Sequence, residues 1–161
     1  MTHDEAGSAS GTRVAGFLTP EHFLPDLRAV NRLEALRELV DAVAAVRSIR
    51  EPGGILRVLR DRETLGTTAI GKGVAIPHGR SLVVARPLLA FARSQHGVAW
   101  DAPDGEDVHL IFLLLAPDAP SSRTPYLEQL AQLARVVALA RNRNRLRLAH
   151  DLDTVRAVLM S

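Results

Sequence analysis

The chain has 161 residues, 47% of them hydrophobic, a formal net charge of +2 and no cysteine. This size and composition predict one globular domain with its own core, and the lack of cysteine excludes disulfides, thiolate nucleophiles and cysteine-ligated zinc. A charge of +2 is too small to indicate a nucleic-acid partner, and no apolar run is long enough to predict membrane insertion.

The N-terminal segment, residues 1–13, is small and polar, and we interpret it as a disordered tail before a domain over residues 14–161. It lacks the basic and apolar stretches of a secretory signal peptide. Together with the absence of cysteine, this predicts a cytoplasmic protein. Residues 14–18 begin the fold in this interpretation, as a first turn or a short strand.

Two helices are predicted next. Asn31 followed by Glu34 is a capping box, and apolar residues at helical spacing follow it, which predicts a helix over residues 32–47. Pro52 and the two glycines after it break the chain. A second amphipathic helix then ends near Gly66.

Strand patterns fill the middle of the chain. A short run over residues 74–76 stops at Pro77, which has no amide hydrogen for a sheet ladder. Further strands are predicted over residues 88–93 and 98–100. Residues 108–115 are apolar at nearly every position, as in a strand buried on both faces.

The C-terminal part reads as helical. A loop rich in proline and serine leads to a long helix that starts near Pro125, an arginine-rich helix edge over residues 141–147, and a last helix over residues 152–160. Helices, then clustered strands, then helices predict an α/β fold, a three-layer α/β/α sandwich with a central mixed sheet. The same order also permits a two-layer α+β arrangement.

One segment, from Ile76 to Arg80, concentrates the candidate chemistry. His78 follows a strand end between a proline and a glycine, a place where rigid sheets position functional groups. A neutral imidazole can act as a nucleophile and take a covalent group. The guanidinium groups of Arg80 and Arg62 match phosphate oxygens.

Further donors precede the histidine. They are the amides of a glycine-rich stretch at residues 71–73 and the hydroxyls of Thr64, Thr67 and Thr68. A lone histidine after a proline is also common in an ordinary turn, so these residues by themselves leave both interpretations open. Of the other histidines, His22 is assigned to a helix start, His96 to a turn and His109 to the buried strand; none shows the spacing of metal ligands.

A longer pattern surrounds the histidine. Residues 62–79 match R-E-x-L-x-S/T-T-x-I-G-x-G-V/I-A-I/V-P-H-G, and residues 104–112 match D-G-x-x-V-x-L-I-F. From about Phe17 to Leu159 the chain resembles the type-2 EIIA domain of the bacterial phosphotransferase system, the fructose–mannitol class that includes the nitrogen-regulatory IIA protein. The resemblance implies an α/β/α sandwich with a mixed sheet.

The resemblance also implies chemistry. In that family the histidine of P-H-G accepts phosphate from a histidine-phosphorylated carrier protein, and the arginine that opens the motif lies near it. By resemblance these residues are His78 and Arg62, and the protein is a phosphotransferase-system component that forms a covalent phosphohistidine. No metal and no cofactor is required.

The sequence departs from the family at one position. The family pattern H-L-x-x-L-x-x-L-A begins with a second histidine, whereas residues 126–134 begin with Tyr126. A tyrosine hydroxyl can still donate a hydrogen bond to the phosphate site, but it adds no positive charge. We therefore expect Arg80, Thr67, Thr68 and Tyr126 to support a site built on His78 and Arg62.

Three functions compete at this stage. The first is a sugar-specific phosphocarrier that passes its phosphate to a IIB domain. The second, which the freestanding chain and Tyr126 favour, is a nitrogen-regulatory IIA-like module whose phosphorylation state changes its binding to a regulated protein. The third is an unrelated small-molecule enzyme with His78 as a base, for which the sequence offers no partner acid.

Overall fold

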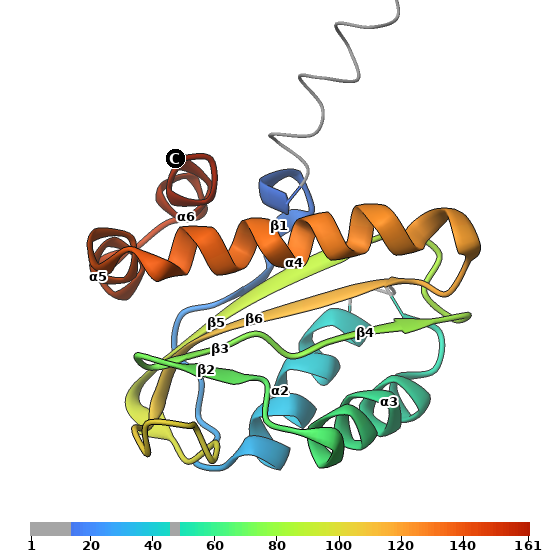
Figure 1. The fold of residues 1–161 in the computed structure, drawn as a ribbon, viewed down its shortest axis with the longest axis horizontal. Helices are drawn as coiled ribbons and strands as arrows, with labels where there is room; N and C mark the ends of the chain where they lie inside the picture. The colour runs from blue at the N-terminus through green and yellow to red at the C-terminus, as the bar shows by residue number, and fades with distance from the viewer. Residues whose placement is uncertain (1–13, 46–48) are drawn as a thin grey trace, which may run out of the picture.

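The computed structural model describes residues 14–45 and 49–161, and the predicted tail lies outside these residues. A mixed sheet forms its centre, with the strand order β1-β5-β6-β3-β2, and β4 also pairs with β6 (Figure 1). Strands β5 and β6 are antiparallel, whereas β3 and β4 both run parallel to β6. The strands are β1 (Leu18–Leu24), β2 (Ala69–Gly71), β3 (Val74–Ala75), β4 (His78–Ser81), β5 (Leu88–Val98) and β6 (Val108–Pro117).

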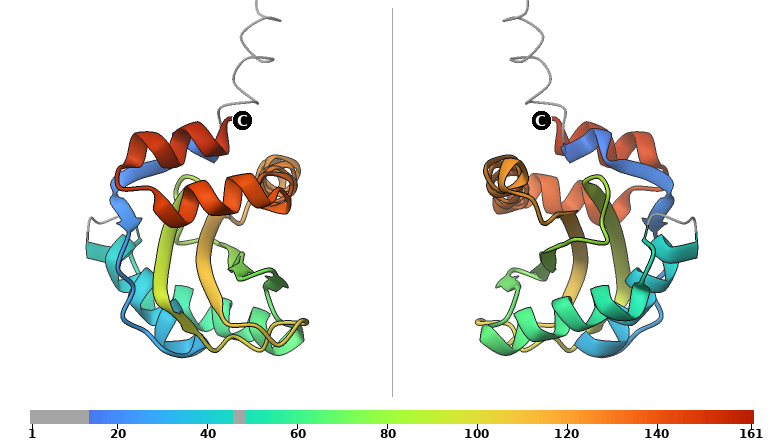
Figure 2. Two further views of the ribbon diagram at one scale, coloured as in Figure 1. Left: turned by 90° about the vertical axis from the view of Figure 1, so that its left-hand side faces the viewer. Right: turned by 90° about the vertical axis from the view of Figure 1, so that its right-hand side faces the viewer.

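Helices cover both faces of the sheet. One face carries α2 (Arg32–Ala45) and α3 (Pro52–Leu65). The opposite face carries α4 (Arg123–Ala138), α5 (Ala140–Leu148) and α6 (Leu152–Leu159), with a short 3₁₀ turn, η1 (Pro120–Ser122), ahead of α4 (Figure 2). This confirms the predicted three-layer α/β/α sandwich, and the two-layer alternative is wrong.

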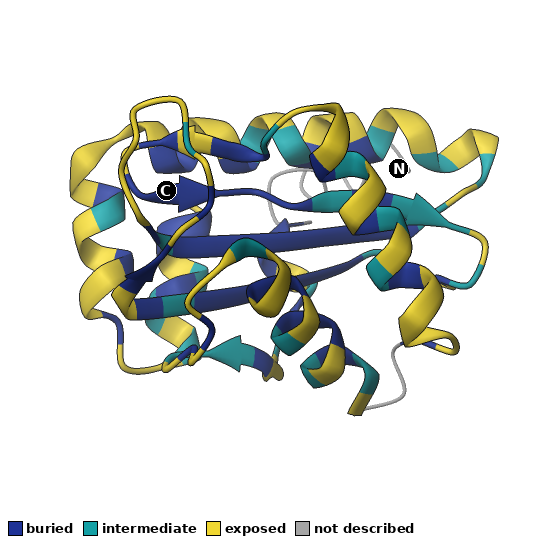
Figure 3. Cartoon of the chain, turned by 90° about the horizontal axis from the view of Figure 1, so that it is seen from below, coloured by how far each residue is buried: buried dark blue, intermediate teal, exposed yellow. Residues whose placement is uncertain are grey.

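Two apolar cores, one on each face, hold the layers together. Along β6, Ile111 and Leu113 belong to the core under α2 and α3, whereas Phe112 and Leu114 belong to the core under α4, α5 and α6. Successive side chains of a strand point to opposite faces, so a strand with a core on each side must be apolar throughout. Figure 3 shows the result, a buried sheet between helices whose outer surfaces are exposed.

The predicted helix boundaries hold closely. The Asn31 side chain accepts a hydrogen bond from the Glu34 amide at 3.0 Å, as a capping residue does, and α2 begins at the next position, Arg32. Residues 46–48, at the end of this predicted helix, lie outside the described residues. Helix α3 ends at Leu65, immediately before Gly66, and α4 begins two residues earlier than predicted, at Arg123.

Three local predictions are wrong. Residues 88–93 and 98–100 are not two strands, because β5 runs unbroken over Leu88–Val98. Gly97, with φ 94°, sits in an irregularity between Arg93 and Val98 and makes no turn there, so His96 lies within the strand. His22 lies in β1 rather than at a helix start, because parallel pairing with β5 outweighs the local helix signal.

Within the residues that the structure describes, no helix combines the length and apolar character needed to cross a membrane.

Candidate functional site

His78 opens strand β4 at the sheet margin. The Pro77 carbonyl accepts a hydrogen bond from the Leu114 amide at 3.0 Å, and His78 then pairs with Leu114 itself. The proline therefore removes one donor but leaves its acceptor in the ladder, and pairing resumes at the next residue. Strand β3 ends at Ala75, so the prediction that this run stops at Pro77 is confirmed. His78, however, stands on a further short strand and not on a loop.

The imidazole of His78 is fixed through one nitrogen. Its Nδ1 lies 2.6 Å from the backbone oxygen of Ile76. A carbonyl oxygen can only accept, so Nδ1 carries the hydrogen in this contact. In a neutral ring the lone pair is then on Nε2, which leaves Nε2 as the nucleophilic nitrogen.

The surroundings keep this ring neutral. Burial lowers the pKa of His78 below its ordinary value, and the positive charge of Arg62 lowers it further. The hydrogen bond to Ile76 and the negative charge of Glu63 raise the pKa, without reversing the net direction. A histidine with a lowered pKa is unprotonated at neutral pH, which is the state a nucleophile needs.

Tyr126 and Arg80 lie beside His78. The Tyr126 ring centroid is 6.0 Å from that of His78, and the Arg80 guanidinium carbon is 5.9 Å from the same tyrosine centroid. His78 and Arg80 are two apart on β4 and so share a face, and Tyr126 comes from the first turn of α4. The Arg80 Nη1 atom also lies 3.4 Å from the Ala119 oxygen and 3.9 Å from an Asp118 carboxylate oxygen.

Arg62 approaches from the other layer. It stands in the last turn of α3, where its Nη1 donates to the Gly66 oxygen at 2.9 Å. The positive charge of Arg62 lowers the pKa of both His78 and Tyr126. Burial raises the pKa of Tyr126 to about 12, against the lowering effects of Arg80 and Arg62, so its phenol stays protonated and can donate.

Gly79 explains how α3 comes so near. A Cβ at this position would lie 3.0 Å from Cγ1 of Val58 and 3.7 Å from Cδ2 of Leu59, both in α3. Glycine lets the helix pack this closely on β4, whereas any side chain here would require Val58 to move by a few tenths of an ångström. The glycine of the Pro-His-Gly element therefore brings Arg62 to the site by packing, not by making a flexible loop.

The threonines expected at the site make other contacts. The Thr68 hydroxyl donates to the Glu63 carboxylate, and the Thr67 hydroxyl donates to the Trp100 oxygen at 3.4 Å. The Thr64 hydroxyl donates to the Asp61 oxygen within α3. The structure thus brings together His78, Arg62, Arg80 and Tyr126, whereas these three hydroxyls bond elsewhere.

The glycine-rich stretch also lies away from His78. It forms the tight turn between β2 and β3, with positive φ at Gly71, Lys72 and Gly73. The Gly73 oxygen bonds to the His109 and Leu110 amides of β6, four to five residues from the partner of His78, which is roughly 13 Å or more along a strand. The expectation that its amides serve the phosphate site is wrong, because Pro77 and β3 separate the two ends.

No role for Glu63 was predicted from the sequence, although this residue stands in the motif beside Arg62. Its side chain is buried at 4% exposure and accepts hydrogen bonds from Thr68 and Trp100. The sequence offered one signal, the place of this glutamate inside the long motif. Its burial and its partners Arg32 and Trp100 could not be predicted, because both partners are more than 30 residues away in the sequence.

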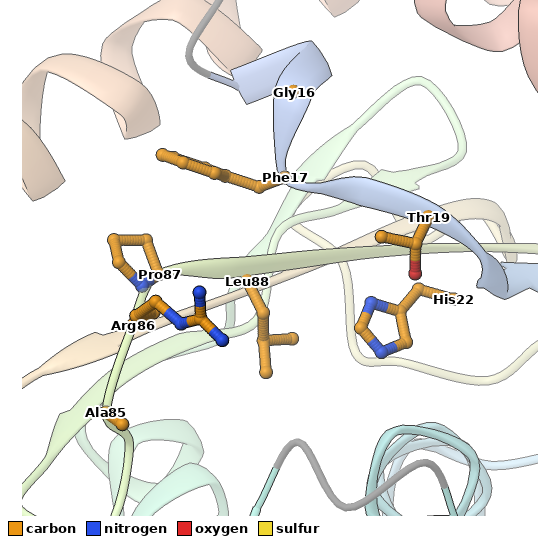
Figure 4. A pocket seen from close by; sticks show the side chains of 8 residues that line it. All are labelled: Gly16, Phe17, Thr19, His22, Ala85, Arg86, Pro87 and Leu88. Atoms are coloured by element: carbon orange, nitrogen blue, oxygen red, sulfur yellow. The ribbon is translucent and has the colours of Figure 1, made fainter.

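A separate cavity of about 540 Å³ opens beside β1 (Figure 4). It is lined by Gly16, Phe17, Thr19, His22, Ala85, Arg86, Pro87 and Leu88. None of the four clustered side chains lines this cavity. Among residues 14–45 and 49–161 there is no group of three or more histidine and carboxylate side chains placed to hold a metal ion.

Comparison with known proteins identifies relatives of two kinds. The chain is 36% identical over 146 residues to a nitrogen regulatory protein of Bradyrhizobium diazoefficiens, covering 91% of this chain and 94% of that protein. It is 33% identical over 125 residues to a fructose-specific EIIA component of Haloferax volcanii, covering 78% and 80% of the two chains.

A solved structure has the same fold over nearly the whole of this chain. The nitrogen regulatory protein IIA-Ntr of Neisseria meningitidis superposes with a TM-score of 0.84 at 33% identity, covering 91% of this chain and 99% of that one. The family model described as phosphoenolpyruvate-dependent sugar phosphotransferase system, EIIA 2, matches residues 16–161. The chain belongs to the EIIA 2 family of the phosphoenolpyruvate-dependent sugar phosphotransferase system.

Proposed function

We propose that this protein is a phosphocarrier that accepts a phosphoryl group on Nε2 of His78 from a histidine-phosphorylated carrier protein. The observation that carries the proposal is the His78 ring itself: Nδ1 is held by the Ile76 oxygen, and burial lowers the pKa. These two features together leave a neutral ring with a free lone pair on Nε2.

The transfer step is a displacement at phosphorus. The Nε2 lone pair forms the new N–P bond while the N–P bond of the donor histidine breaks, and its electron pair returns to the donor ring. The proton on Nδ1 of His78 stays in place, bonded to Ile76. Arg62 and Arg80 offset the charge on the phosphoryl oxygens, and the Tyr126 hydroxyl donates a hydrogen bond.

The surface around the site suits a protein donor. Leu65, Leu82 and Leu127 are 85%, 85% and 52% exposed. They lie at the end of α3, directly after β4 and near the start of α4, so each follows a residue of the cluster by one to three positions. Exposed leucines beside two arginines favour a docking surface for another protein over a small-molecule pocket.

The second part of the proposal concerns the role in the cell. The similarity to nitrogen regulatory proteins, which spans nearly their whole length, supports a cytoplasmic regulatory module whose phosphorylation changes its affinity for a target protein. The alternative, a sugar-specific IIA component that hands its phosphate to a IIB domain, is supported by the fructose-specific relative.

Intact-mass measurement tests the first part. The protein is incubated with the histidine-phosphorylated carrier protein, and one acid-labile phosphoryl group is expected on the parent chain. His78→Ala should abolish labelling while circular dichroism shows an intact fold. Normal labelling of that variant would refute the assignment. The phosphorylated protein is then mixed with a fructose-type IIB domain. If it passes the phosphoryl group on as fast as it receives it from the donor, the sugar-specific alternative is correct.

A further inference from the structure

Glu63 holds a buried carboxylate at the end of α3, one position after Arg62. Its Oε2 accepts a hydrogen bond from the Thr68 amide at 3.2 Å and lies 3.4 Å from Nη1 of Arg32. Its Oε1 accepts from the Thr68 hydroxyl and, at 3.4 Å, from the Trp100 indole. The two carboxylate oxygens thus lie against four hydrogen-bond donors from three other residues.

These contacts tie Glu63 to three separate parts of the fold. Thr68 lies just before β2, Trp100 lies beyond the end of β5, and Arg32 begins α2. A buried charge that several donors surround is held in one position, because moving it would leave those donors unsatisfied. The negative charge of Glu63 is therefore a fixed feature of the site's surroundings.

Adjacent residues of α3 present opposite charges to His78. The Thr68 amide donates to Glu63, the Thr68 oxygen accepts from the Ile76 amide at 3.0 Å, and the Ile76 oxygen contacts Nδ1 of His78, so Glu63 is two residues away from the imidazole along a chain of hydrogen bonds. In agreement with this placement, the charge of Arg62 lowers the pKa of the imidazole, and the charge of Glu63 raises it. Arg62 is partly exposed at the site, whereas Glu63 is buried. The two charges can therefore serve different parts of a phosphohistidine, which is anionic at its phosphoryl oxygens and cationic in its ring.

We propose that Glu63 is a positioning residue whose fixed negative charge stabilises the positive imidazole ring of phosphorylated His78. This deepens the proposed function and rests on it. When Nε2 bonds to phosphorus and Nδ1 keeps its proton, the ring has no lone pair left in its plane and carries a positive charge. The Ile76 oxygen accepts from that ring at Nδ1, and Glu63 supplies the opposing unit charge through the protein.

The test is Glu63→Gln, which keeps the size of the side chain and removes the charge. The His78 pKa, followed by NMR titration of the imidazole, should fall below that of the parent protein. The equilibrium of phosphoryl exchange with the carrier protein should shift toward the donor by about tenfold, the order expected for one charge in a partly solvated interior. An unchanged pKa together with an unchanged equilibrium would overturn the proposal.

Thr68→Val is the matched control. It removes one hydrogen bond from the same buried network and leaves the charge, so it should lower thermal stability while the His78 pKa and the exchange equilibrium stay at parental values. If this variant reproduces the shifts of Glu63→Gln, the network acts through structure and the proposal fails.

Arg32→Gln gives a result of opposite sign and needs no change at Glu63. Without its cationic partner, the carboxylate acts on His78 more strongly, and the His78 pKa should rise. A pKa that stays constant in Arg32→Gln would overturn the proposal even if Glu63→Gln did not fold. Failure of the proposed function is seen separately, as absence of phosphoryl label on the parent chain, whereas these titrations use the unphosphorylated protein.

Discussion

The rings of His78 and Tyr126 lie 6.0 Å apart between centroids, with 54° between their planes. Arg80 stands 5.9 Å from the same tyrosine. The position that the family pattern gives to a second histidine thus holds a phenol, with a permanent cation next to it. Because burial raises the pKa of Tyr126 to about 12, its phenol stays neutral near neutral pH.

Replacing Tyr126 should alter the stability of the phosphorylated form. Tyr126→His should lengthen the phosphohistidine half-life below about pH 6.5, where an unperturbed imidazole is charged and donates a stronger hydrogen bond. Tyr126→Phe should shorten the half-life or slow phosphorylation at every pH. The half-life of the phosphorylated protein is measured across pH for both variants. If both half-lives match those of the parent protein, Tyr126 does not contribute to the phosphate site.

The rate of phosphorylation should stay constant as the pH falls from neutral to about 6.5. Burial lowers the pKa of His78, so the nucleophilic neutral ring persists to lower pH than in a free histidine, which titrates near 6.5. Single-turnover rates should be level above about pH 6.5 and should decline only below it. A decline centred above pH 6.5 would contradict the direction of this shift.

The same lowered pKa predicts a contribution to stability. Between the folded pKa of His78 and about 6.5, the unfolded chain binds more protons than the folded one, so stability rises with pH across this window and levels off above it. His78→Gln should flatten that part of the curve. Denaturant unfolding of both proteins at several pH values checks this, and parallel curves would contradict it.

Loss of Arg62 should slow transfer without unfolding the domain. Its charge reaches His78 and Tyr126, and removal of such an electrostatic contact typically costs on the order of 10²-fold in rate. Arg60→Ala is the control, since it removes an exposed arginine from the same helix. Equal rates in the two variants, measured by rapid quench, would make Arg62 a surface residue.

Gly79→Ala should separate α3 from β4. The added methyl group would lie 3.0 Å from Val58 Cγ1, and such overpacking typically destabilises by about 1–3 kcal/mol. Transfer should slow as well, because α3 carries Arg62. Gly53→Ala, also in α3, meets no atom within 4 Å and should leave stability unchanged or raise it by up to about 1 kcal/mol. Urea unfolding measures the free energy of unfolding of both variants. If Gly79→Ala is as stable as the parent protein, close packing of α3 on β4 is not the reason for this glycine.

The sequence alone was sufficient for features that are encoded locally. The capping box at Asn31 predicted the start of α2, and the run over residues 108–115, apolar at nearly every position, predicted a strand buried on both faces. The motif over residues 62–79 identified His78 and Arg62 as candidates for the proposed phosphate site. Each of these signals depends on neighbours within one element or one short stretch of chain.

Only the tertiary structure decided which groups are available for chemistry. The hydroxyls of Thr67 and Thr68 looked equivalent to other donors, but Trp100, 33 residues from Thr67, and the buried Glu63 engage them. In the sequence Gly79 was only the residue after His78 in the motif, and its role depends on how closely α3 packs on β4. Whether a polar group is free or bonded depends on long-range packing, because residues distant in sequence supply its partners. The residue types of the site are therefore local information, whereas its working donors and its fixed charges are set by the fold.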